Sequence, residues 1–134
     1  MKATAIWQKN FQSVLTNNRG HQVIVDLPKA KNGDDSGPTA FELSLMSLAG
    51  CFSTIFALVA SKSRVEIEAL KVDCDGQTTD DGMQFTSITT TVEVSSPADE
   101  ATLRKILEKT KEICPVGTIF NRAQIPNTTI LVKK

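Results

Sequence analysis

The sequence is poor in the residues from which metal centres and disulfide scaffolds are built. His21 is its only histidine, and its three cysteines, Cys51, Cys74 and Cys114, form no Cys-x-x-Cys pair. A lone imidazole without a cysteine or carboxylate cluster does not make a metal site, so we expect neither a metal nor another cofactor. Three cysteines, an odd number, also disfavour the disulfide framework of a secreted protein and fit reduced thiols in the cytoplasm.

Neither sign of charge is in excess. The chain has 15 basic and 15 acidic residues, which are interspersed and form no basic stripe with interleaved aromatic residues. It therefore lacks the electrostatic footprint of a nucleic-acid-binding protein. Residues 1–7 lack the continuous apolar stretch of a signal peptide, so the cytoplasm is the expected location. A length of 134 residues, 40% of them hydrophobic, predicts a single domain over residues 1–134.

The longest uncharged segment lies between Glu42 and Lys62. Its apolar residues recur at steps of three and four, which predicts a helix over residues 41–61. Other apolar residues extend beyond this stripe, so we expect the helix to be the central core element and buried on most sides. The segment nearly matches a bilayer in length, but its serines and threonine make it poor hydrocarbon, and we expect no membrane span.

A second helical pattern covers residues 96–113, with Ser96 as the expected N-cap and Pro97 in the first turn. Pro115 disfavours helical geometry at Cys114 but suits the first turn of a helix, so residues 116–121 are expected to begin a short helix with Cys114 as N-cap. Backbone N–H groups and the helix dipole would there favour a thiolate and lower the pKa of Cys114. The alternative is a cysteine that only fills a corner of the core.

The rest of the chain has the pattern of strands. Cys74 has charged neighbours and no motif around it, so we expect it to have no catalytic part. Turns are predicted at residues 17–20 and 79–82. Together with the helices, the strands give an α+β fold. The expected strands cover residues 3–8, 11–16, 21–27, 67–75, 84–95 and 128–133.

Three short motifs carry a resemblance to a known family. GPTAFEL at residues 37–43 leads into AGC at residues 49–51, and CPV follows about sixty residues later at residues 114–116. In these motifs, and in the order of its elements over nearly the whole chain, the sequence resembles the OsmC/Ohr family of osmotically inducible and organic hydroperoxide resistance proteins, in its OsmC-like branch. The resemblance implies antiparallel sheets around a long buried central helix, in an intertwined homodimer with active sites at the interface.

The same resemblance implies a thiol peroxidase. Cys51 would attack an organic hydroperoxide and become a sulfenic acid, which Cys114 would convert into a disulfide before over-oxidation. An external dithiol would then reduce the disulfide. The competing hypothesis is a non-catalytic OsmC-like protein that binds an apolar small molecule.

The family pairs its peroxidatic cysteine with an arginine that a glutamate holds. Glu42 stands nine residues before Cys51, on the opposite side of an ideal helix, and could alternatively be a carboxylate that stabilises the helix start. Arg19, in the predicted turn, is the candidate arginine and Arg122 its alternative, although each could be an ordinary surface charge. The absence of an arginine at the family position favours the non-catalytic hypothesis.

Overall fold

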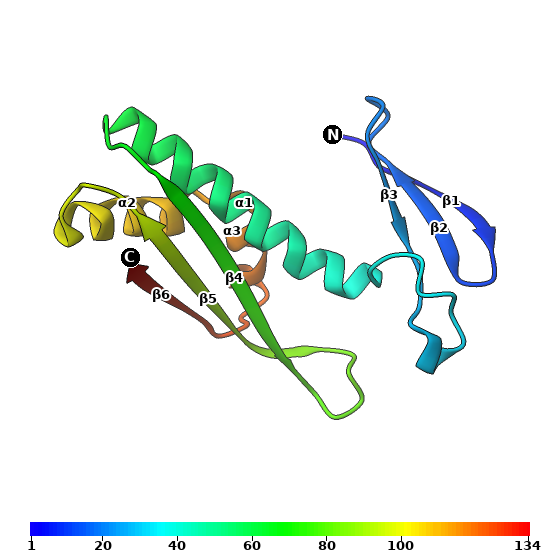
Figure 1. The fold of residues 1–134 in the computed structure, drawn as a ribbon. Coiled ribbons are helices and arrows are strands. Elements are labelled where there is room, and N and C mark those ends of the chain that lie inside the picture. The colour runs from blue at the N-terminus through cyan, green and yellow to red at the C-terminus, as the bar shows by residue number, and fades with distance from the viewer. The chain divides into compact units, whose positions relative to one another are not determined.

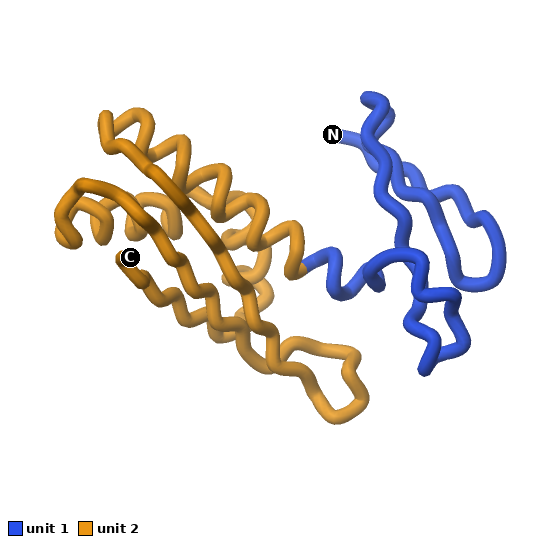
Figure 2. The backbone as a smooth tube through the Cα atoms, viewed as in Figure 1, with its two compact units in different colours: residues 1–44 blue, residues 45–134 orange.

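The computed structural model describes residues 1–134, which form two compact units, Met1–Ser44 and Leu45–Lys134 (Figure 2). Each unit is built around its own three-stranded sheet. The six predicted strands and three predicted helices are all present, with strand bounds within three residues of those expected. The α+β class is therefore confirmed, while a single domain over residues 1–134 stays a prediction.

The N-terminal unit is an antiparallel meander of β1 (Thr4–Lys9), β2 (Gln12–Thr16) and β3 (Gln22–Val25). The predicted turn at residues 17–20 joins β2 and β3, and Asn18 and Gly20 there have φ angles of 60° and 90°. Asparagine and glycine are the residues that adopt this left-handed backbone most readily. A short 3-10 helix, η1 (Lys29–Lys31), follows in the connector to helix α1 (Ala40–Lys62).

The second unit contains a sheet in the order β4 (Ala69–Thr78), β5 (Phe85–Ser95) and β6 (Asn127–Lys133) (Figure 1). The predicted turn at residues 79–82 makes β4 and β5 an antiparallel hairpin. Strand β6 instead runs parallel to β5, because the chain returns through helices α2 (Glu100–Ile113) and α3 (Pro115–Arg122). The expectation of purely antiparallel sheets is thus wrong for this sheet, which is mixed.

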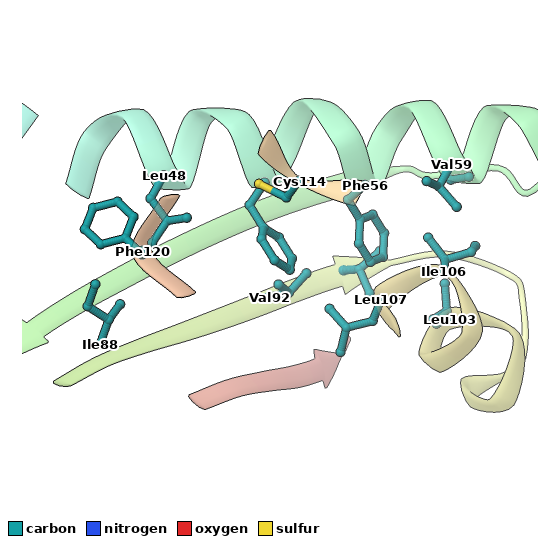
Figure 3. Close-up of a cluster of buried hydrophobic side chains, with 13 residues drawn as sticks. Leu48, Phe56, Val59, Ile88, Val92, Leu103, Ile106, Leu107, Cys114 and Phe120 are labelled. Atoms are coloured by element: carbon teal, nitrogen blue, oxygen red, sulfur yellow. The ribbon is translucent and has the colours of Figure 1, made fainter. Parts of the chain in front are cut away.

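One face of the second sheet carries the hydrophobic core. Burial alternates along β5, as its sequence predicts, and places Ile88 and Val92 in the core at 1% and 0% exposure. Figure 3 shows side chains from α1, α2 and α3 gathered over these two residues. The helices contribute Leu48, Phe52, Phe56 and Val59 from α1, Leu103, Ile106 and Leu107 from α2, and Phe120 from α3.

Helix α1 is buried along one stripe only. Leu48 and Phe56 are fully buried, whereas Met46 and Leu58 on other faces are 54% and 43% exposed. The expected burial on most sides is therefore not met within one chain. By length and composition α1 could cross a membrane, and 28% of its most apolar window is buried in the core.

The start of α2 differs from the prediction. Asp99 is the N-cap, and its Oδ1 accepts a hydrogen bond from the backbone N–H of Thr102 at 2.7 Å. Ser96 instead donates its hydroxyl to the carbonyl of Glu66 at 2.6 Å. Both residue types suit an N-cap, and the long-range bond of Ser96 decides between them.

A candidate dithiol site

Two cysteines that lie 63 residues apart in sequence are in contact: Cys51 in helix α1 and Cys114 at the junction of α2 and α3. The Sγ atoms of Cys51 and Cys114 are 3.4 Å apart, with Cys114 placed to donate to Cys51. Cys51 is partly exposed. Cys114 is fully buried within the core cluster, among whose side chains Figure 3 shows it. Both thiols are free, and their sulfurs are in contact. The structure thus brings together the two residues expected to carry the redox chemistry.

Cys114 joins two helices and caps both. Its backbone N–H donates to the carbonyl of Thr110 at 2.9 Å, which closes α2, and its carbonyl accepts from the N–H of Thr118 at 3.0 Å in α3. Its sulfur accepts from the backbone N–H of Gly117 at 3.4 Å. Pro115 occupies the first turn of α3, where its missing N–H costs nothing. The predicted N-cap role of Cys114 is confirmed.

The predicted lowering of the pKa of Cys114 is wrong. The pKa of this thiol is raised to about 11, chiefly by burial; the N–H groups of Gly117 and Val116 offset this only in part, and the hydrogen bond and charge of Cys51 add to the rise. The helix N-terminus is present, but removing the sulfur from water outweighs it. Cys114 therefore keeps its proton at neutral pH.

A small cavity of about 40 Å³ lies beside Cys114. It has room for at least one water molecule. Lys111 of α2 and Asn127 of β6 are among its polar lining residues. No sequence motif points to either residue, because the cavity is enclosed by four elements of the fold. The remaining lining residues are Phe52, Gly117, Asn121 and Thr129.

Cys74 lies apart from this pair, on β4. Its sulfur is 3.6 Å from Oγ1 of Thr90, and the hydroxyl of Thr90 in turn donates to Oδ1 of Asn127 at 3.3 Å. Burial raises the pKa of Cys74, which keeps it protonated at neutral pH. That Cys74 has no catalytic part stays a prediction.

Glu42 closes a capping box at the start of α1. Its Oε2 accepts hydrogen bonds from the backbone N–H and the hydroxyl of Thr39 at 2.7 and 2.9 Å, and Oγ1 of Thr39 accepts from the N–H of Glu42 at 3.1 Å. This reciprocal arrangement satisfies two free N–H groups of the helix start. The capping role that the sequence allowed for Glu42 is thus present, and any role in activating Cys51 stays a prediction.

Neither of the two candidate arginines forms a salt bridge with a carboxylate. Arg19 is in the exposed turn between β2 and β3, where its backbone N–H donates to Oδ1 of Asn17 at 2.9 Å. Arg122 is exposed in the last turn of α3. Within residues 45–134, no arginine donates a hydrogen bond to either sulfur of the pair. The identity of the activating cation stays a prediction.

The fold is shared with several solved proteins. A structure of an OsmC-like protein from Mycoplasma pneumoniae superposes with a TM-score of 0.85 at 20% identity, covering 98% of this chain and 95% of that one. An organic hydroperoxide resistance protein from Elizabethkingia anophelis gives a TM-score of 0.75 at 18% identity, with 98% and 94% covered. One from Legionella pneumophila, described as an organic hydroperoxide resistance protein OsmC, gives 0.69 at 15%, with 98% and 95% covered.

Identities this low establish a common fold and leave activity open. A comparison with curated protein sequences finds no match. The sequence model of the OsmC-like proteins matches residues 33–129, a segment that holds both cysteines of the pair and most of the chain. On this match and the shared fold, the chain belongs to the OsmC-like family.

Proposed function

We propose that the protein is a thiol-dependent peroxidase that reduces organic hydroperoxides through a Cys51–Cys114 dithiol/disulfide cycle. The observation that carries this proposal is the 3.4 Å contact between the two sulfurs, with Cys51 partly exposed and Cys114 buried behind it. Cys51 is the more accessible of the two residues to a substrate, and the buried Cys114 is held where its sulfur can attack the product of the first step.

The cycle balances with these two sulfurs. The thiolate of Cys51 attacks the O–O bond, becomes a sulfenic acid and releases the substrate as an alcohol after protonation. The sulfur of Cys114 then attacks the sulfenic sulfur, while its proton leaves with the hydroxyl group as water. The sulfurs must approach from 3.4 Å to about 2.05 Å, a shift of about 1.4 Å. An external dithiol returns the two electrons.

The substrate class rests on the relatives. Those from Elizabethkingia anophelis and Legionella pneumophila are named organic hydroperoxide resistance proteins. The buried surroundings of the pair, with Leu48 and Phe52 in the same cluster, suit an alkyl group better than a polar peroxide. Arg19 remains our candidate for the activating cation, and Glu42 for its partner.

We propose further that the working species is a cytoplasmic homodimer. The argument is the apolar surface that one chain leaves uncovered, with Met46 and Leu58 exposed on α1, Ile6 and Trp7 exposed on β1, and Phe11 exposed in the turn after β1. Exposed apolar surface of this kind is typical of protein interfaces.

The alternative function is a non-catalytic binder of an apolar small molecule. The observation that favours it is the lack of an arginine bonded to either sulfur within residues 45–134. A thiol that nothing activates would react slowly with peroxides. The two functions differ in whether the protein consumes peroxide.

Treatment of the reduced protein with one equivalent of cumene hydroperoxide tests the proposal. We expect peptide mapping to find a Cys51–Cys114 disulfide and a free Cys74. Cys51→Ser should abolish even a single turnover, whereas Cys114→Ser should complete one turnover and accumulate sulfenic and sulfinic acid at Cys51. Cys74→Ser is the matched control and should cycle like the parent. If Cys51→Ser and the parent consume peroxide equally, or not at all, the peroxidase is refuted in favour of the binder.

A further inference from the structure

The sulfur of Cys114 accepts one hydrogen bond and is placed to donate another. The backbone N–H of Gly117, in the first turn of α3, donates to this sulfur at 3.4 Å. The same sulfur lies 3.4 Å from Sγ of Cys51 and has the geometry of a donor toward it. Because Cys114 is fully buried, water does not compete for its proton. The three groups therefore form a chain in which Gly117 donates to Cys114 and Cys114 donates to Cys51.

The proton that this chain requires is present at neutral pH. Burial is the main cause that raises the pKa of Cys114 to about 11, so the residue is a thiol. A thiol is a weak donor on its own. Donation by the N–H of Gly117 polarises the sulfur and strengthens the bond that its proton makes. The N–H groups at a helix start carry partial positive charge, and the chain passes part of that field to Cys51.

A donor beside Cys51 matters most when this residue is charged. The thiolate is the attacking form of a cysteine, and a partly buried thiolate is stabilised by a donor or a cation next to it. No arginine within residues 45–134 donates to the sulfur of Cys51, whereas the thiol of Cys114 lies against it. The charge of Cys51 also helps to keep the proton on Cys114. Linkage is reciprocal, so that proton favours the charge on Cys51 to the same extent.

We propose that the protonated thiol of Cys114, backed by the N–H of Gly117, is the hydrogen-bond donor that stabilises the attacking thiolate of Cys51. Cys114 thus acts twice, first as a donor during the attack on the peroxide and then as the nucleophile that closes the disulfide. This inference rests on the proposed Cys51–Cys114 cycle and assigns a group to its peroxide-reducing step.

The step balances without moving the proton of Cys114. One lone pair of the Cys51 thiolate accepts from Cys114, while another attacks the terminal oxygen of the hydroperoxide. The S–O bond forms as the O–O bond breaks, two electrons pass from sulfur to oxygen, and the departing alkoxide takes a proton from water. The proton of Cys114 leaves later, with the hydroxyl group of the sulfenic acid, when its own sulfur attacks.

The first turnover tests the proposal, because the disulfide-forming step does not contribute to it. Reduced protein in excess over cumene hydroperoxide is followed by the loss of peroxide, and the ultraviolet absorbance of the thiolate is measured before mixing. A hydrogen bond to a charged group shifts the thiolate population about tenfold, and the lower nucleophilicity of the stabilised thiolate cancels about half of this on a logarithmic scale. Cys114→Ala should therefore slow the first turnover about threefold.

Two further variants separate donation from packing. Cys114→Ser keeps a hydroxyl donor and should react like the parent. Cys114→Val fills a similar volume without a donor and should be as slow as Cys114→Ala. Both variants without a donor should also lose thiolate absorbance, which a change in packing alone would not cause. If Cys114→Ala does not fold, the comparison of Cys114→Val with Cys114→Ser decides the question.

Cys74→Ala is the matched control, because Cys74 packs against the same core cluster and its sulfur contacts Thr90. It should react like the parent. Equal first-turnover rates for the parent and Cys114→Val overturn the inference but leave the peroxidase proposal standing. Equal slowing in Cys114→Ser and Cys114→Val also overturns it, because any substitution at the junction would then have the same effect. A parent that consumes no peroxide overturns both proposals.

Discussion

Formation of the Cys51–Cys114 disulfide should stabilise the folded chain, because the bond closes a long loop. The two residues are 63 positions apart. For a loop of that length, the lost entropy of the unfolded chain is about 14 cal/mol/K, or about 4 kcal/mol at 25 °C. An unfolding entropy of about 2.1 cal/mol/K per residue then converts this into a rise in melting temperature of about 14 °C for 134 residues.

The full gain requires that the bond form without strain. The sulfurs are already in contact at 3.4 Å, and the remaining approach of about 1.4 Å is within reach of side-chain rotation and a small shift of α1 or α3. Distortion of the double cap at Cys114 would reduce the gain. The measured rise in melting temperature therefore reports how closely the geometry of the reduced pair matches that of the disulfide.

Differential scanning calorimetry of the reduced and diamide-oxidised forms measures this effect. A Cys74→Ser background prevents other pairings, and both samples need equal protein concentration, because association would shift the melting temperature. The Cys114→Ser variant should not respond to diamide. An oxidised form with a mapped Cys51–Cys114 bond but an unchanged or lower melting temperature would refute the reasoning that the pair is positioned for closure.

Three further outcomes are expected. Cys114 in the reduced native protein should resist iodoacetamide at pH 8, where a pKa of about 11 leaves about one thiolate in a thousand. The protonated thiol should also stabilise the fold: this contribution is fully present below the pKa of 9.0 of an exposed thiol and is lost as the pH rises through about 11. Urea unfolding at several pH values would measure this loss. Gly76→Ala should cost about 1–3 kcal/mol in urea unfolding, because its Cβ would lie 2.6 Å from the ring of Phe85, and an unchanged midpoint would contradict this packing. The parent should sediment as a dimer at micromolar concentration with a melting temperature that depends on concentration, and a monomer would refute the homodimer.

The local structure follows from sequence where periodicity and turn chemistry act alone. The apolar steps of residues 41–61 predict α1 almost to its observed bounds, and Pro115 separates α2 from α3 as expected. Local pattern cannot identify which strand pairs with which, so the parallel pairing of β6 with β5 was missed. The choice of Asp99 over Ser96 as N-cap likewise depends on a carbonyl 30 residues away from Ser96.

The candidate site was predictable only in part. The two cysteines came from motifs and family resemblance, and the structure supplies their contact. The direction of the pKa shift at Cys114 could not be predicted, because it depends on burial by residues of several other elements. Lys111 carries no motif, and only the folded chain places it at the same cavity as Cys114.

The double cap at Cys114 shows that folding and the redox cycle make different requirements of this position: folding requires a capping residue, and the cycle requires a sulfur. A serine hydroxyl at this position could accept from the N–H of Gly117 at least as well as a sulfur does, and serine is a preferred N-cap residue. A chain with serine at 114 would therefore fold around the same helix junction yet could form no disulfide with Cys51. Folding does not require a sulfur atom at this junction, so Cys114→Ser would abolish the redox cycle and leave the architecture intact.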